Sequence, residues 1–262
     1  MTDRLRKAMV GFPRFEPGHV WLAGAGPGDP GLLILHALAG LAEADVVVHD
    51  ALVDDRVLAL ANPGATLEFA GKRGGRPSPS QANITDRLIA VARANHSVLR
   101  LKGGDPCMFG RGGEEALALA AAGIPFRIVP GVTSGLAALT VASIPATVNQ
   151  ALILVTGHCG DEEDTIDWAA LVQIGQPIVL YMGLRNLDGI AASLMDAGLD
   201  PHEPVAVIAS ATLSEQRILI SELHRVAAET RELEFEALAI IAIVRVRQKL
   251  LDLAARVPEM VV

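Results

Sequence analysis

The sequence predicts an α/β protein made of two α/β domains with a cleft between them. Short apolar runs of strand length alternate with stretches in which apolar residues recur every three or four positions, a pattern of strand–helix–strand units. Two glycine-rich loops, residues 24–31 and 103–113, each follow an apolar run and precede a helical pattern. This alternation predicts a mainly parallel sheet with helices on both faces in the first domain.

The first half of the chain contains the clearest strand signals. The predicted strands are, in chain order, 19–23, 44–50, 67–69, 97–101 and 126–129. Helices are predicted at about 32–44, 54–60, 81–94, 114–122 and from the loop 130–135 to about 143. In the helix at 81–94, for example, the apolar residues Ile84, Leu88 and Val91 recur at helical spacing.

The pattern changes after Pro145, where strand runs follow one another with fewer helices between them. The predicted strands here are 151–156, 177–183, 204–210, 217–221 and 237–244, with one helix at about 187–197. Consecutive strands favour some antiparallel pairing. We therefore expect an N-terminal extension at 1–17, a first domain at 18–147 and a second at 148–262.

Composition excludes several classes of function. The net charge of −8 argues against nucleic-acid binding, which needs a basic face. Cys107 and Cys159 are the only cysteines and lack metal-site spacing, which predicts a reducing compartment, the cytoplasm, and no zinc site. No apolar run approaches the roughly 20 residues of a membrane span, so no membrane partner is expected.

The loop at 103–113 carries the strongest functional signal. Its two leading glycines let the backbone approach a ligand closely, and Asp105 is either an acceptor for that ligand or the start of a turn. Arg111 lies between glycines, where it could clamp a carboxylate or pair with Glu114 or Glu115 in the first turn of the next helix. The sequence leaves both pairs of alternatives open.

Other strand ends add polar or glycine-rich positions. His49 and Asp50 close the second strand, where Asp50 could be catalytic or a turn aspartate. The loop at 24–31 departs from the dinucleotide fingerprint because Asp29 occupies the third glycine position and Pro27 lacks an N–H. Two later strands end in the motifs TGH at 156–158 and YMG at 181–183. The sequence shows no catalytic Ser-His-Asp arrangement, metal triad or Walker lysine.

Together these segments resemble the tetrapyrrole methyltransferases, most closely the branch that C-methylates uroporphyrinogen III. The matching stretches are 20–33, 44–53, 69–75, 98–106, 109–116, 123–135, 156–158 and 181–183. The resemblance implies the two-domain tetrapyrrole methylase fold and a homodimer. It also implies S-adenosylmethionine as methyl donor, no metal, and methylation of carbons 2 and 7 to give precorrin-2, on the branch towards sirohaem, cobalamin and haem d1.

The resemblance also implies residue roles, carried over motif by motif. The implied contacts to S-adenosylmethionine are Pro27, Gly103, Gly104, Asp105, Met108, Thr133, Ser134, Met182, Ala211 and Ala237. Asp50, Arg111 and Glu114 fall where the family places residues for substrate handling or proton removal.

The acceptor side is where this chain departs from the family pattern. A substrate with eight carboxylates needs a local basic patch, for which the sequence offers Lys72, Arg73, Arg76, Arg100, Lys102 and Arg111. Val148 and Asn149 stand where relatives usually carry histidine and arginine. Three interpretations follow: a uroporphyrinogen-III methyltransferase, a methyltransferase for a later precorrin or another acceptor, and a weakly active paralogue that binds S-adenosylmethionine.

Overall fold

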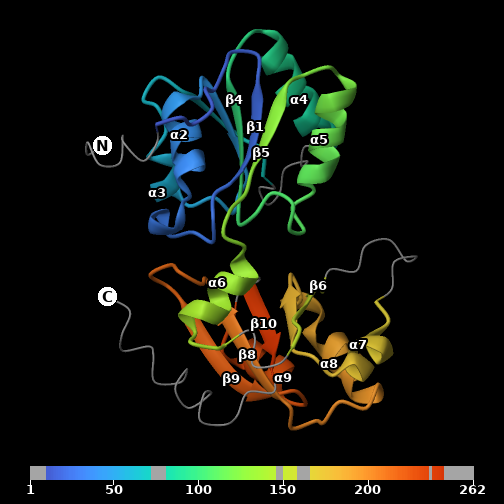
Figure 1. Cartoon of the computed structure of the whole chain (residues 1–262). Coiled ribbons are helices and arrows are strands. Elements are labelled where there is room, and N and C mark those ends of the chain that lie inside the picture. The colour runs from blue at the N-terminus through green and yellow to red at the C-terminus, as the bar shows by residue number, and fades with distance from the viewer. Residues whose placement is uncertain (1–9, 72–80, 146–149, 158–165, 236–237, 245–262) are drawn as a thin grey trace. The chain divides into compact units, whose positions relative to one another are not determined.

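The chain folds into two compact units, residues 1–133 and 134–262. The computed structural model describes residues 10–71, 81–145, 150–157, 166–235 and 238–244 (Figure 1). Within these ranges, no helix has both the length and the apolar character that crossing a bilayer requires.

The first unit is built on a five-stranded sheet whose strands all run parallel, in the order β3-β2-β4-β1-β5. The strands are β1 (Val20–Gly24), β2 (Val46–His49), β3 (Thr66–Phe69), β4 (Val98–Lys102) and β5 (Phe126–Val129). Every residue of β1 and β4 is buried, and β1 accordingly reads as a continuous apolar run. The predicted parallel sheet is confirmed.

Helices cover both faces of this sheet, as the sequence predicted (Figure 1). The helical elements are η1 (Pro30–Leu32), α2 (Leu35–Glu43), α3 (Asp55–Leu58), α4 (Gln81–Arg93) and α5 (Gly112–Ala121). Neighbouring residues of β1 point to opposite faces, so Trp21 joins the core under α2 and α3 while Leu22 joins the core under α4 and α5.

The second unit contains a mixed sheet in the order β6-β7-β10-β8-β9. Its strands are β6 (Ile153–Thr156), β7 (Ile178–Tyr181), β8 (Pro204–Ala209), β9 (Arg217–Glu222) and β10 (Ala239–Ile243). Only β6 and β7 pair in parallel, whereas β10 and β9 join their neighbours antiparallel. The predicted antiparallel pairing in this half is confirmed.

Two helices of the second unit were not predicted from the sequence. The helical elements here are α6 (Ser134–Val141), α7 (Trp168–Ile174), η2 (Leu184–Asn186), α8 (Leu187–Asp196) and α9 (Val226–Glu232). Helices α7 and α9 span seven residues each, about two turns. So short a segment repeats its apolar face too few times for periodicity to reveal it.

Helix α6 belongs to the second compact unit, which begins at Ser134. The backbone N–H of Gly135 donates a hydrogen bond to the Tyr181 hydroxyl oxygen at 3.1 Å, which anchors the helix to the second sheet. A Cβ at Gly135 would lie 2.2 Å from that oxygen, so this contact requires glycine. The helix is predominantly apolar, so its pattern does not indicate which sheet it covers.

Candidate active site

Three loops meet at the carboxyl edge of the first sheet. Gly104 donates a backbone hydrogen bond to the Gly26 carbonyl at 2.7 Å, and Gly26 donates one back at 3.2 Å. A Cβ at Gly24 would lie 2.4 Å from the Gly104 carbonyl oxygen and 2.6 Å from the Gly131 Cα. The two glycine-rich loops singled out in the sequence therefore touch each other and the loop after β5, and the contact depends on glycine.

Asp105 ties two of these loops together. Its Oδ1 accepts a hydrogen bond from the backbone N–H of Cys107 at 2.8 Å, and its Oδ2 accepts one from the N–H of Gly131 at 3.0 Å. The Cys107 contact forms the turn that the sequence offered as one alternative. Asp105 thus positions the loops, and both of its oxygens already have backbone donors.

A buried group of charges lies on the other side of β4 from the α2 core. Arg100 and Lys102 are two positions apart in β4, so their side chains lie on the same face of the sheet, and they are 1% and 4% exposed. Glu115 of α5 is completely buried and accepts from Arg100 Nε at 3.1 Å and from Lys102 Nζ at 3.3 Å. Arg100 and Lys102, which the sequence analysis offered for a basic patch that binds the substrate, are instead buried and paired with the carboxylates of Glu115 and Asp50.

Asp50 connects this group to the surface. Its Oδ1 accepts from Arg100 Nη2 at 2.5 Å, its Oδ2 lies 3.8 Å from Lys102 Nζ, and its side chain is 25% exposed. We call Asp50, Arg100, Lys102 and Glu115 the buried charge cluster. Burial lowers the pKa of Lys102, as does the Arg100 charge, while Asp50 and Glu115 oppose the shift. Two cations face two carboxylates.

Glu115 is the site residue that sequence reasoning assigned only to a helix end. Besides the two cations, its Oε1 accepts from Gln81 Nε2 at 2.8 Å, whereas Oε2 has no partner among the described residues. The helical spacing held the signal, since Glu115 shares the buried face of α5 with Ala116 and Leu119. Glu114 lies on the exposed face instead.

Arg111 and Glu114 form an ion pair at the start of α5. Arg111 Nε and Nη2 each donate to one Glu114 oxygen at 2.7 Å, with both side chains more than half exposed. Arg111 lowers the pKa of Glu114 through this contact. The helix-start pairing that the sequence offered is therefore present. Arg111 also has a left-handed φ of 58°, which is uncommon outside glycine.

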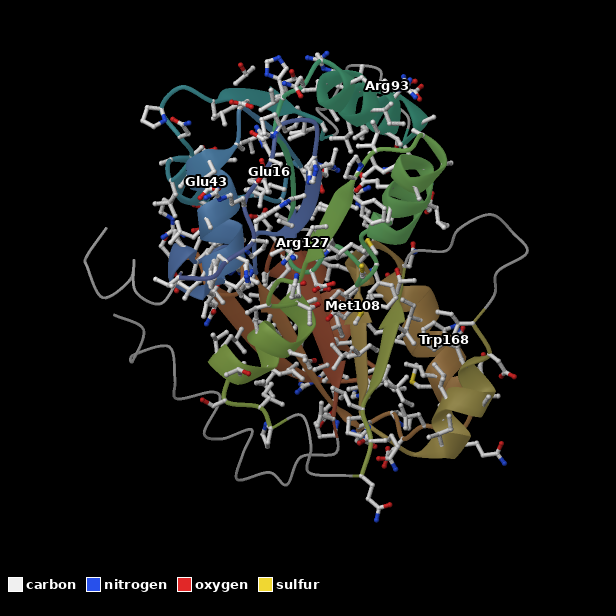
Figure 2. All side chains as sticks on the ribbon, turned by 45° about the horizontal axis from the view of Figure 1, so that its top comes forward. Glu16, Glu43, Arg93, Met108, Arg127 and Trp168 are labelled. Atoms are coloured by element: carbon white, nitrogen blue, oxygen red, sulfur yellow. The ribbon has the colours of Figure 1, made fainter. Side chains whose placement is uncertain are left out.

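The remaining predicted contacts come from loops of both units. Pro27 and Met108 follow β1 and β4 (Met108 is labelled in Figure 2), and Thr133 ends the first unit. In the second unit, Met182 follows β7, is 48% exposed and has a left-handed φ of 55°. Ser134 begins α6, and Ala211 lies in the loop after β8.

Several sequence-predicted positions lie outside the described residues. These are Lys72, Arg73, Arg76, Val148, Asn149, His158, Cys159 and Ala237.

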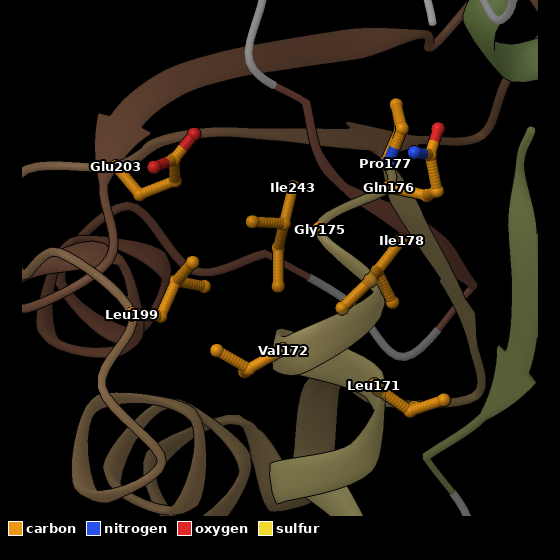
Figure 3. A pocket seen from close by; sticks show the side chains of 9 residues that line it. All are labelled: Leu171, Val172, Gly175, Gln176, Pro177, Ile178, Leu199, Glu203 and Ile243. Atoms are coloured by element: carbon orange, nitrogen blue, oxygen red, sulfur yellow. The ribbon is translucent and has the colours of Figure 1, made fainter. Parts of the chain in front are cut away.

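The second unit contains a small pocket, shown in Figure 3, that none of the predicted contacts lines. It is lined by Leu171, Val172, Gly175, Gln176, Pro177, Ile178, Leu199, Glu203 and Ile243. Ile178 begins β7, whereas Met182 follows the opposite end of that strand. Its volume of about 20 Å³ holds roughly one water molecule, too little for a methyl donor or a tetrapyrrole.

Comparison with known proteins places these features in a family. Residues 19–227 match the Tetrapyrrole (Corrin/Porphyrin) Methylases. A uroporphyrinogen-III C-methyltransferase from a Sinorhizobium species is 50% identical over 239 residues, 89% of this chain and 85% of the relative. The siroheme synthase of Zymomonas mobilis is 43% identical over 86% of this chain. The match covers about half (49%) of that longer protein.

Solved structures agree with the sequence relatives. The uroporphyrin-III C-methyltransferase of Thermus thermophilus, complexed with S-adenosyl homocysteine, is 38% identical with a TM-score of 0.75, over 87% of this chain and 97% of that one. A cobalt precorrin-4 methyltransferase is 26% identical with a TM-score of 0.78, over 89% and 98% of the two chains.

Proposed function

The chain belongs to the tetrapyrrole (corrin/porphyrin) methylases, and from this we propose that it transfers methyl groups from S-adenosylmethionine to carbons 2 and 7 of uroporphyrinogen III, giving precorrin-2. The observation that carries the proposal is 50% identity to a uroporphyrinogen-III C-methyltransferase over 89% of the chain. The enzyme class is an S-adenosylmethionine-dependent C-methyltransferase.

The glycine loops fit S-adenosylmethionine. Gly24, Gly104 and Gly131 bring three stretches of backbone together without side chains, and Asp105 ties two of these stretches to each other. Backbone groups can recognise the amino acid and nucleoside parts of the donor, and these loops offer no lysine for a phosphate chain. The donor contacts implied by the resemblance, from Pro27 to Ala237, remain part of the proposal. When bound, the donor supplies an already activated methyl group.

The chain's own residues then have two tasks: to align the acceptor carbon and to take up the proton it loses. Asp50 suits proton removal or pyrrole binding because Arg100 fixes one of its oxygens while a quarter of the side chain reaches solvent. The hydrogen bond from the buried Arg100 guanidinium thus fixes the orientation of the Asp50 carboxylate. Asp50 is accordingly the proposed catalytic residue of the first unit.

Arg111 is proposed to bind a substrate carboxylate by exchanging partners. Its pair with Glu114 is more than half exposed, and ion pairs of this kind contribute only about 0–1 kcal/mol. A carboxylate of the substrate can therefore displace Glu114 at little cost in free energy. The pair seen here is then the resting state of the carboxylate clamp considered in the sequence analysis.

A direct assay tests the proposed activity. The chain is incubated with uroporphyrinogen III and S-adenosylmethionine labelled in the methyl group, and label is followed into the tetrapyrrole by mass spectrometry. Two labelled methyl groups per product are expected. A parallel incubation supplies a later precorrin as the acceptor. Label in that precorrin but none in uroporphyrinogen III would favour the second candidate activity, which the resemblance to cobalt precorrin-4 methyltransferase supports. Label in neither would support the weakly active paralogue.

Donor selectivity is the first prediction. We expect calorimetry to show S-adenosylmethionine and its demethylated product binding more tightly than ATP or NAD, because the loop at 24–31 departs from the dinucleotide fingerprint at Pro27 and Asp29 and none of the three loops carries a Walker lysine. Tighter binding of either nucleotide would contradict the assignment of the loops.

Assembly is the second prediction. The resemblance implies a homodimer, and symmetric dimers are the commonest soluble oligomers. Light scattering of the purified chain at micromolar concentration should give about twice the 27.5 kDa of one chain. A mass near that of one chain would remove this prediction.

A further inference from the structure

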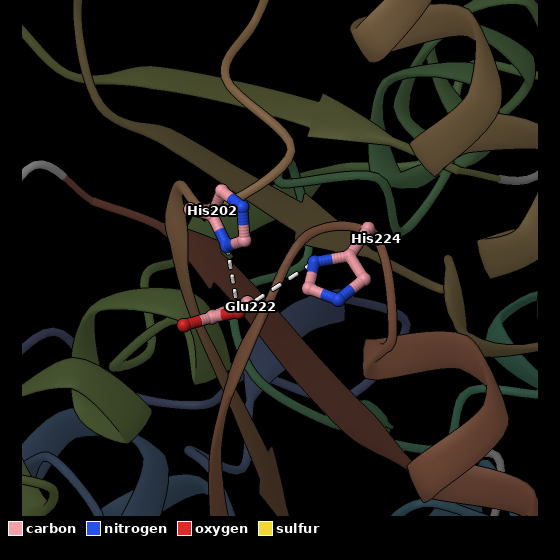
Figure 4. Close-up of side chains that lie close together, drawn as sticks. All are labelled: His202, Glu222 and His224. Atoms are coloured by element: carbon pink, nitrogen blue, oxygen red, sulfur yellow. Dashed lines mark hydrogen bonds and ion pairs between the residues drawn. The ribbon is translucent and has the colours of Figure 1, made fainter.

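His202, Glu222 and His224 bring three metal-ligating side chains together on the second unit (Figure 4). His202 Nδ1 lies 3.0 Å from Glu222 Oε2, and His224 Nδ1 lies 3.6 Å from the same oxygen. One ligand atom from each residue lies within 4.8 Å of the other two. We propose that these residues form a binding site for a divalent transition metal ion of the zinc type, separate from the methyl-transfer chemistry.

The spacing matches tetrahedral coordination. Bonds of about 2.1 Å from a zinc ion to nitrogen and oxygen ligands place neighbouring ligand atoms roughly 3.4 Å apart. The distances of His202 Nδ1 and His224 Nδ1 from Glu222 Oε2, 3.0 and 3.6 Å, lie on either side of that value. Small side-chain rotations therefore suffice to close the site around an ion, with a fourth position left to water.

The donor set selects the class of metal. Two imidazoles and one carboxylate suit zinc, nickel or copper. Magnesium and calcium instead prefer sites composed mostly of oxygen ligands. We therefore expect discrimination between zinc and magnesium.

The backbone that carries the ligands is held in place before any ion binds. Glu222 ends β9, directly opposite Pro204 of β8. The His224 N–H donates to the Pro201 carbonyl at 3.0 Å, and the His202 N–H donates to Asp200 Oδ1 at 2.9 Å. A preorganised scaffold lowers the entropy lost on binding.

The charges around the site permit a cation to enter. Arg225 Nε lies 3.8 Å from Glu222 Oε2 but 3.5 Å from Glu229 Oε1, so Arg225 keeps a partner when an ion occupies Glu222. An ion bound at His224 Nδ1 displaces the contact of that nitrogen with the Pro201 carbonyl.

Calorimetry with zinc chloride on the untagged full chain at pH 7.5 tests the site. The variants His202→Ala and His224→Ala should each weaken zinc binding at least about tenfold, since each removes one of three ligands. His96→Ala is the matched control, because His96 is also exposed and lies 4.0 Å from a carboxylate, that of Asp45. This control should bind zinc as tightly as the parent chain does. Magnesium should not compete with zinc for the site in the parent chain.

Cobalt(II) provides a second readout. Its visible absorption should show the intense bands of tetrahedral coordination in the parent chain and in His96→Ala, and these should be lost in the double variant His202→Ala/His224→Ala. Failure of the parent chain to bind zinc overturns the proposal, as does binding that persists unchanged in the double variant. Circular dichroism of the double variant checks that the fold is intact.

Discussion

Replacing Glu115 by alanine is expected to reduce the free energy of unfolding of the first unit by about 3–5 kcal/mol. The substitution leaves Arg100 and Lys102 buried with only Asp50 to balance them, and removes the acceptor shared by three donors. Denaturant unfolding should be measured in a Trp168→Phe background. Trp21, buried in the first unit, is then the only tryptophan and reports that unit alone.

Glu114→Ala is the matched control, because it removes the neighbouring carboxylate from the same turn of α5. Glu114 is 56% exposed and pairs with an equally exposed arginine, so its loss should change the free energy of unfolding by less than about 1 kcal/mol. Equal effects of the two substitutions would show that the buried charge cluster does not determine the stability of this unit.

Replacing Arg111 by alanine is expected to lower kcat/KM for uroporphyrinogen III by roughly ten- to a hundredfold while leaving donor binding unchanged. The estimate corresponds to loss of a charge-assisted contact of about 1.5–3 kcal/mol. Asp50→Asn should behave similarly, because the amide keeps an acceptor for Arg100 but cannot take up a proton. Steady-state kinetics reports kcat/KM for uroporphyrinogen III, and calorimetry reports the affinity for S-adenosylmethionine, so the two measurements separate acceptor handling from donor binding.

Arg87→Ala serves as the control for Arg111. Arg87 is also exposed and also donates two hydrogen bonds to one glutamate, Glu68, in the same unit. It should leave kcat/KM unchanged. If Arg111→Ala also has no effect on methyl transfer, Arg111 only stabilises the start of α5 by pairing with Glu114.

Local patterns were enough to predict the first sheet and the loops at its carboxyl edge. Each strand is a short run of sequence, and glycines mark the places where backbones touch, such as Gly24 against Gly104.

Contacts between residues that are distant in the sequence could not be predicted from local patterns. Arg100 contacts Asp50 across 50 positions, and nothing near Arg100 in the sequence distinguishes a buried cation from a surface one. Arg100 and Lys102 were assigned to the basic patch for that reason.

The choice between the adjacent glutamates depended on helical spacing rather than on residue type. Glu114 and Glu115 are equivalent as acids at the start of a helix, but only Glu115 shares the buried face of α5 with Ala116 and Leu119. Local patterns are also insufficient for α6, which is predominantly apolar and is anchored to the second sheet by the hydrogen bond between Gly135 and Tyr181, 46 positions apart.

The junction of Gly24, Gly104 and Gly131 also bears on the order of folding. These residues lie at the ends of β1, β4 and β5, which neighbour one another in the sheet but are separated by long stretches of chain. Closing such long loops costs conformational entropy, and this cost is offset only by contacts that form afterwards. Strand pairings of this kind therefore form slowly. The donor loops can come together only once β4 and β5 have docked on β1. In refolding experiments, recovery of donor binding should therefore lag behind the return of helical signal.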